Sequence, residues 1–173
     1  MSDGPHQRSR HRSLPAGEPE RPAVGAPAPR VVFDTEQGQL PLESFAGSML
    51  VVYFFPRAMT PGCTAEACDF RDQHGAFRDA GAVVMAVSPD SPERHARFSA
   101  RYQLPFYLAT DPEGVVADAF GVGVRKVSRG VPQRGVERST FLIDGRGILV
   151  ASWRRVRVPG HVGEVLAVVH GRR

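Results

Sequence analysis

The hydrophobic pattern of this chain is dominated by one continuous apolar segment, Met49 to Phe55. Its residues are β-branched or aromatic and do not alternate with polar ones, which is typical of a strand buried on both faces of a sheet. Pro56 ends this strand. Thr60 then offers a hydroxyl at a helix N-cap position, and Pro61 suits the first helical residue, where no N–H is needed. We therefore predict a helix that begins at the carboxyl end of a core strand.

Shorter apolar runs and helical periodicities between turn signals predict the remaining elements. The predicted strands are 31–33 and 39–42 around a turn at 36–38, then 49–55, 82–88 and 106–108, and a hairpin of 139–143 with 147–152 around an Asp-Gly turn. The predicted helices are 60–77 with a bend, 91–102, 111–120 and 161–170, and residues 121–135 are predicted to form a Gly/Arg-rich loop. This order predicts an α/β fold with a mixed central sheet and helices on both faces, which a thioredoxin-like three-layer sandwich satisfies.

The domain organisation follows from composition. Residues 1–29 are rich in Pro, Arg, Gly and Ser and are predicted to be a disordered basic tail, so that residues 30–173 form a single domain starting near Val24 to Val31. The tail has no apolar segment of the kind found in secretory signals. No run approaches the roughly 18 apolar residues that span a membrane. We expect a cytoplasmic protein without a membrane partner.

The charge of the chain is positive but dispersed. The net charge is +4 and the isoelectric point is near 9.7. Residues 1–30 hold five arginines against three acidic residues, and the rest of the chain carries the remaining +2 with both signs interspersed. This distribution favours an Arg-rich solvated surface, and we expect no nucleic-acid partner.

Both cysteines, Cys63 and Cys68, lie in the predicted helix after the central strand. In a cytosolic chain two cysteines are not expected to form a structural disulfide. Two thiols without a suitably spaced histidine make a poor zinc site, and the spacing is C-x4-C rather than the C-x-x-C of thioredoxin-type motifs. Catalytic thiol chemistry or two inert buried thiols remain.

Thiol chemistry requires help beyond the helix itself. A free thiol with a pKa of ~8.5 is mostly protonated at neutral pH. Making the thiolate predominant takes roughly 2.7 kcal/mol of preferential stabilisation, whereas a helix N-terminus supplies about 0.3–1 kcal/mol, or up to ~2 when partly buried. A cation and further hydrogen-bond donors are therefore expected near a reactive cysteine.

The residues around the cysteines match a known pattern. Pro56-x-x-x-Thr60-x-x-Cys63 resembles the peroxiredoxin active-site signature, and the longer segment PRAMTPGCTAEACDFRD, residues 56–72, is similar to bacterioferritin comigratory protein (Q-type) peroxiredoxins of the atypical two-cysteine kind. The resemblance continues through RSTFLID, residues 138–144, and through residues 153–165. It covers residues 24–170.

The resemblance implies a thioredoxin-dependent thiol peroxidase. Cys63 would be the peroxidatic nucleophile, Thr60 would hydrogen-bond the peroxide and the thiolate, and Pro56 would shield the sulfur from water. Arg138 would supply the missing cation, and Cys68 would be the resolving cysteine. Thioredoxin or a similar dithiol would reopen the disulfide, and no metal, haem or flavin is needed. The chain would be a monomer or a weak homodimer.

Each role has a plainer alternative. Cys63 or Cys68 could be a buried structural thiol, Thr60 could be no more than a helix cap, and Arg138 has no special standing apart from the resemblance. Arg57, Glu66 and Asp69 are predicted to be helix-surface or local pairing groups. The histidines at 74, 95, 161 and 170 are expected to be solvated.

Two other functions stay open. One is a thiol-disulfide oxidoreductase acting on protein thiols, for which the same fold would serve; an insulin-reduction assay would identify it. The other is a basic DNA-associated or holdase protein without enzymatic activity. The segment 121–135 is more basic and less aromatic than the resemblance leads us to expect, which leaves the preferred peroxide and any partner that docks there undetermined.

Overall fold

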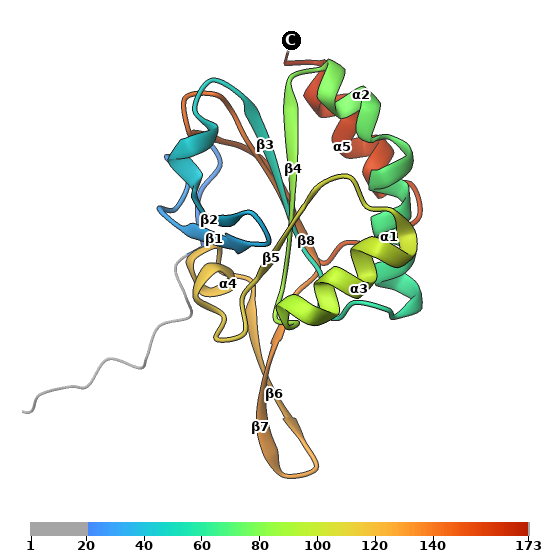
Figure 1. Ribbon diagram of the computed structural model, residues 1–173. Helices are drawn as coiled ribbons and strands as arrows, with labels where there is room; N and C mark the ends of the chain where they lie inside the picture. Colours follow the sequence, from blue (N-terminus) through green and yellow to red (C-terminus); the bar gives the residue numbers. More distant parts are fainter. Residues whose placement is uncertain (1–20, 173) are drawn as a thin grey trace, which may run out of the picture.

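The computed structural model describes residues 21–172 (Figure 1). The prediction of a disordered tail lies outside the described residues for positions 1–20. Residues 25–28 are hydrogen-bonded to residues 147–149, late in the sequence: the Gly25 N–H donates to the carbonyl of Leu149 at 2.7 Å and the Ala28 N–H to that of Gly147 at 2.9 Å. The folded domain therefore begins before residue 30, near Val24.

A seven-stranded mixed sheet forms the centre of the molecule. The strand order is β2-β1-β5-β4-β3-β8-β9; β3, β4 and β5 are mutually parallel, and every other neighbouring pair is antiparallel. The strands are β1 (Val32–Thr35), β2 (Gly38–Pro41), β3 (Met49–Phe54), β4 (Ala82–Ser88), β5 (Tyr107–Thr110), β8 (Ser139–Ile143) and β9 (Leu149–Trp153). The central position of β3 agrees with its continuous apolar sequence.

Helices cover both faces of the sheet, as predicted for a thioredoxin-like three-layer fold. Four helices lie on one face, on the right in Figure 1: α1 (Pro61–Asp72), α2 (His74–Asp79), α3 (Pro92–Tyr102) and α5 (His161–His170). The short helix α4 (Val115–Ala119) and the 3-10 helix η1 (Leu42–Phe45) lie on the other face. Each layer buries one set of side chains from every central strand.

The two hydrophobic cores divide the residues of β3 between them. Val51 and Tyr53 point into the core under α1, α3 and α5, and Val52 and Phe54 point into the core under α4 and η1. Side chains of a strand alternate between its faces, so a strand buried on both faces needs apolar residues at every position. Because both cores hold β3 in place, they also fix the position at which this strand ends and the chain leaves the sheet toward α1.

The prediction of a loop over 121–135 is wrong. These residues form most of a separate two-stranded antiparallel hairpin, β6 (Gly123–Ser128) and β7 (Val131–Val136), which projects from the body in Figure 1. Neither face of the hairpin is covered by another layer, so its sequence shows no alternation of apolar and polar residues.

Two helix boundaries also differ from the prediction. The long helix predicted over 60–77 with a bend is divided at Gln73 into two helices, α1 and α2. Helix α4 begins at Val115 rather than Asp111, because the buried Asp111 carboxylate stays outside the helix and accepts hydrogen bonds from the N–H groups of Val116 (3.1 Å) and Ala117 (2.9 Å).

Candidate active site

The loop between β3 and α1 is held by contacts from neighbouring elements. The Phe55 N–H donates to the carbonyl of Val87 at 3.0 Å. Asp90, just beyond β4, accepts the Ala58 N–H at 2.7 Å, and Arg94 on α3 donates to the Ala58 carbonyl at 2.6 Å. Met59 follows with a positive φ of 69°. These contacts fix where α1 starts.

Thr60 is the N-cap residue of α1, but its hydroxyl does not cap the helix. No side-chain cap hydrogen bond forms; Thr60 Oγ1 donates instead to the carbonyl of Arg57 at 2.7 Å. The prediction that the hydroxyl serves as a conventional cap is therefore wrong, because the tight turn at 57–60 offers it a nearer acceptor. The N–H groups of Gly62 and Cys63 have no acceptor within the helix.

Cys63 occupies the first turn of α1 and is 1% exposed. Arg138 Nη2 donates to its Sγ at 3.3 Å. Arg138 lies directly before β8, whose Ser139 is paired with Phe54 at the end of β3. The structure thus brings together a thiol, a helix N-terminus and a guanidinium from segments 75 residues apart.

A buried carboxylate orients this guanidinium. Arg138 Nη1 donates to Glu66 Oε1 at 3.0 Å, and Glu66 is completely buried on the turn of α1 after Cys63. Burial raises the pKa of Glu66 to about 7, against the opposing attraction of Arg138. Burial alone would lower the pKa of Arg138, but the attraction of Glu66 and Cys63 raises it instead.

The prediction that Glu66 is a helix-surface or local pairing group is wrong, because Glu66 is buried and its partner, Arg138, comes from a distant segment. The spacing of three residues between Glu66 and Cys63 was the available signal, since positions i and i+3 share a helix face.

Tyr53, on β3, lies in the same hydrophobic core as Cys63, and its ring stacks on Phe70 with centroids 4.4 Å apart. Burial first, then the negative charges of Glu66 and Cys63, raises the pKa of Tyr53. Within residues 21–172, Tyr53 Oη and Glu66 Oε2 are both buried without a hydrogen-bond partner.

Two histidines expected to be solvated are buried. His161, at the start of α5, shares a hydrogen bond of 2.7 Å with the Thr140 hydroxyl, and burial together with the positive charge of Arg138 lowers its pKa to about 4. His95 shares one of 2.6 Å with the Ser88 hydroxyl. His161 is therefore neutral at physiological pH and adds no second cation beside the thiol.

The other two predicted residues, Pro56 and Cys68, are more exposed than Cys63. Pro56 is exposed at the start of the β3–α1 loop. Cys68 is half-buried on the next turns of α1, and both cysteines are free thiols. Arg71 lies beside Cys68, and its guanidinium donates to the carbonyl of Tyr102 at 2.9 Å and to Asp72 at 2.9 Å.

Two other kinds of feature are absent from the described residues. Positions 21–172 contain no group of three or more His, Cys, Asp or Glu side chains placed to hold a metal ion. The helices of that same region include none long and apolar enough to cross a membrane.

Comparison with known proteins gives consistent matches. Residues 24–152 match the model of the AhpC/TSA family. The peroxiredoxin Bcp of Bacillus subtilis (strain 168) is 46% identical over 144 residues, which are 83% of this chain and 92% of the relative. A structure of the bacterioferritin comigratory protein of Xanthomonas campestris, described for its alkyl peroxide reduction activity, superposes with a TM-score of 0.76 at 38% identity and covers 82% of this chain and 91% of that one. A mutant of the Xylella fastidiosa PrxQ superposes with a TM-score of 0.81 at 31% identity, covering 88% and 98%.

Proposed function

Since this chain belongs to the AhpC/TSA family and is a peroxiredoxin of the Bcp/PrxQ type, a peroxidase, we propose that Cys63 reduces hydrogen peroxide and organic hydroperoxides and that Cys68 resolves the product. The observation that carries the proposal is the 3.3 Å contact between Arg138 Nη2 and Cys63 Sγ at a buried helix N-terminus. A cation and a helix terminus together favour a thiolate.

In the first step the Cys63 thiolate attacks the terminal oxygen of the hydroperoxide. An S–O bond forms, the O–O bond breaks, and the leaving oxygen takes up a proton to depart as water or an alcohol. The sulfur is oxidised to a sulfenic acid. Arg138 holds the thiolate and stabilises the charge that develops on the leaving oxygen, in a site where burial strengthens the interaction.

Thr60 and the start of α1 supply the uncharged hydrogen-bonding groups for this step. The Gly62 and Cys63 N–H groups have no partner in the helix and point from its positive end. The Thr60 hydroxyl donates to Arg57 O, which leaves its oxygen lone pairs free to accept the hydroperoxide O–H. Pro56, at the exposed start of the loop, limits the access of water to the sulfur.

In the second step the Cys68 thiol attacks the Cys63 sulfur, an S–S bond forms and water leaves. Cα atoms five residues apart in an α-helix are about 8.6 Å apart, whereas a disulfide needs them within roughly 7 Å. The first turns of α1 must therefore unwind before the cysteines can bond.

In the third step thioredoxin or a similar dithiol reopens the disulfide. One reductant thiolate attacks to give a mixed disulfide, and its second thiol displaces the peroxiredoxin, so that both cysteines leave as thiols and the reductant as a disulfide.

The test is NADPH-coupled peroxide consumption with thioredoxin and thioredoxin reductase. Cys63→Ser should abolish turnover. Cys68→Ser should consume one equivalent of peroxide, accumulate sulfenic acid and be overoxidised by further peroxide unless an external thiol rescues it. Turnover of Cys63→Ser at the wild-type rate, or insulin reduction without peroxide consumption, would contradict the proposal.

A further inference from the structure

The hairpin of residues 123–136, here called the basic arm, stands apart from the rest of the fold. Its two strands pair only with each other and form a sheet separate from the central one. Figure 1 shows it extending well beyond the end of the sheet at which the active site lies. An isolated two-stranded ribbon is marginally stable in water, so a projecting one calls for a functional explanation.

Every charged side chain of the basic arm is positive: Arg125, Lys126, Arg129 and Arg134. Arg125 and Arg134 are directly opposite each other in the ladder, and like charges in that arrangement are destabilising. Of these four residues, only Arg134 has an ion pair within residues 21–172, with Asp118 at 3.2 Å. The arm thus concentrates positive charge at the expense of its own stability.

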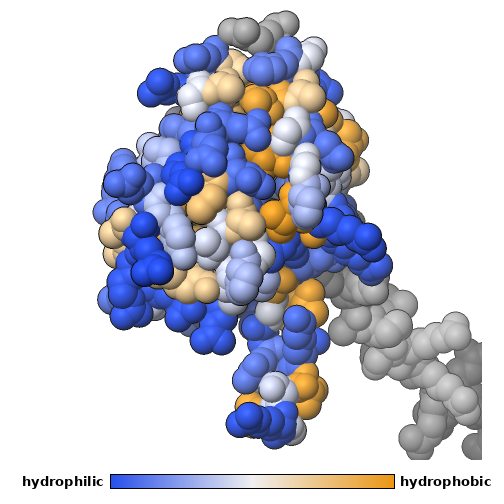
Figure 2. All heavy atoms as spheres, turned by 90° about the vertical axis from the view of Figure 1, so that its right-hand side faces the viewer, coloured by the Kyte–Doolittle hydropathy of each residue, from blue (hydrophilic) through white to orange (hydrophobic). Residues whose placement is uncertain are grey.

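The end of the basic arm also exposes apolar surface. Val127 is 75% and Val131 57% exposed on either side of the turn. Figure 2 shows hydrophobic atoms among the hydrophilic ones on the projecting part of the molecule. The two valines offer a partner protein apolar area to bury beside charges that can orient it.

The base of the arm is joined to the active site. Only Glu137 separates β7 from Arg138, the residue that contacts Cys63, and the Glu137 N–H donates to the carbonyl of Val122 at 2.8 Å, closing the foot of the hairpin. An open cleft of about 340 Å³ lies at this foot, between the arm and α4, and Arg125 and Arg134 line it. Arg138 thus links the foot of the arm to Cys63, and a protein that contacts the arm lies at the end of the sheet that carries the active site.

We propose that the basic arm is the docking site for a protein dithiol reductant that presents an acidic, partly apolar surface around its cysteines. This inference rests on the function proposed above. Hydrogen peroxide and simple alkyl hydroperoxides are small and uncharged, so the exposed positive charges of the arm do nothing to recruit them. A protein reductant must approach the Cys63–Cys68 disulfide in a fixed orientation, and complementary charge accelerates and orients such encounters.

The positive charges could instead serve only to keep the open edges of the ribbon from pairing with other chains. Acidic side chains would do that equally well. Reversing the charge of the arm therefore separates docking from edge protection.

The test compares the triple variant Arg125→Glu, Lys126→Glu, Arg129→Glu with a control of equal charge change on other exposed positions, Arg78→Glu, Arg97→Glu, Arg172→Glu. Arg134 is left in place because it also bonds the carbonyl of Glu113 at the foot of the arm. The probe is a thioredoxin with a net negative surface, kept reduced by thioredoxin reductase and NADPH, and dithiothreitol replaces it in a parallel assay.

We expect the arm variant to raise the KM for this thioredoxin about tenfold or more at low salt, and the difference to shrink in about 0.5 M salt because ions screen exposed charges. Turnover with dithiothreitol should be unchanged in the arm variant, and the control should behave as wild type in both assays.

Equal KM values for the arm variant and the control would overturn the docking site, and so would loss of the dithiothreitol-supported rate. Arm-dependent binding of duplex DNA without arm-dependent use of thioredoxin would assign the arm to nucleic acid and also overturn it. If wild type consumes no peroxide even with dithiothreitol, the proposed function fails; docking is then decided by fluorescence titration of the same proteins with thioredoxin. Affinity lost only in the arm variant supports docking, and equal affinities refute it.

Discussion

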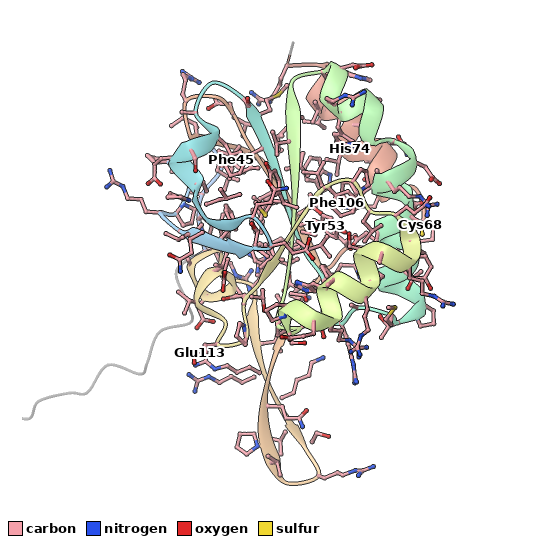
Figure 3. The ribbon with its side chains drawn as sticks, viewed as in Figure 1. Phe45, Tyr53, Cys68, His74, Phe106 and Glu113 are labelled. Carbon is pink, nitrogen blue, oxygen red and sulfur yellow. The ribbon has the colours of Figure 1, made fainter. Side chains whose placement is uncertain are left out.

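The two cysteines lie on one helix but in opposite surroundings. Cys63 is 1% exposed and held by Arg138, which is itself held by the buried Glu66. Cys68 is half-buried. The guanidinium of its neighbour Arg71 donates hydrogen bonds to the carbonyl of Tyr102, at the C-terminal end of α3, and to Asp72. Figure 3 shows Cys68 at the outer edge of the helical layer, whereas Tyr53 lies inside, against the sheet.

In the proposed mechanism the two halves of the reaction make opposite demands on this helix. Attack on peroxide needs a fixed thiolate surrounded by oriented donors. Resolution needs the same segment to open, because an intact helix keeps the cysteines apart. In the proposed mechanism α1 serves both steps, with Cys63 buried at its N-terminus and Cys68 less buried further along. The following changes test that difference.

The largest effect is expected from Arg138→Ala. It removes the guanidinium from Cys63 and should slow the second-order reaction with peroxide by about 10²- to 10³-fold, the usual loss for one oriented donor to a developing anion. Stopped-flow fluorescence with hydrogen peroxide measures it. The double variant Arg138→Ala, Glu66→Gln relieves the buried carboxylate left unpaired, so a slow rate in both variants reflects chemistry and not misfolding. Wild-type rates in the double variant would remove Arg138 from the mechanism.

Glu66 should make the reduced protein less stable as the pH rises. Its pKa is about 7 in the folded protein against 4.5 in the unfolded chain, so the folded state holds the proton more tightly. This contribution is fully present below the unfolded pKa and is lost as the pH rises through 7, a change of roughly 3 kcal/mol in the free energy of unfolding. Glu66→Gln stays uncharged and should flatten the curve. Urea unfolding between pH 5 and 8 tests this, and parallel curves for the two proteins would contradict it.

Oxidation should loosen α1 while leaving the sheet unchanged. Amide hydrogen exchange over residues 60–70 should be faster in the disulfide form than in the reduced form by about tenfold or more, because local opening exposes the N–H groups. Strand β4 provides the internal control. Equal protection in both forms, with the Cys63–Cys68 bond confirmed by mass spectrometry, would rule out unwinding.

A smaller effect is expected from Asp90→Ala, which frees the Ala58 N–H and loosens the loop before α1. The rate with peroxide should fall about tenfold, since small displacements of a reacting group are costly. The rate of disulfide formation after oxidation should stay within about twofold of wild type. A slowed resolution step with a normal peroxide step would reverse the distinction between the two cysteines.

The parts of the site that were predictable are those encoded locally or by a specific motif. The apolar run of β3 and the Thr60-Pro61 junction locate α1 and therefore place Cys63 in its first turn. The proximity of Arg138 came from the resemblance, because nothing in the sequence near either residue indicates a contact across 75 positions. The packing of β8 against β3 creates that contact.

The errors have physical reasons as well. Glu66 is a charged residue in a helix that also exposes Pro61 and Ala65, and only its partner from another element explains its burial. The basic arm was missed because a ribbon with no covered face has no hydrophobic period to detect. The Thr60 hydroxyl was assigned to the helix because sequence does not reveal which nearby backbone group it will reach.

One residue of the loop before α1 stores conformational energy. Met59 has a φ of 69°, a left-handed backbone conformation that costs a non-glycine residue roughly 1–2 kcal/mol. The two hydrogen bonds on Ala58 and the first turn of α1 hold it there. In the unwinding proposed above, opening of that turn would let Met59 relax to an ordinary conformation, and the strain released would offset part of the cost of unwinding. A strained residue at this point would therefore favour the conformation in which the two cysteines can meet.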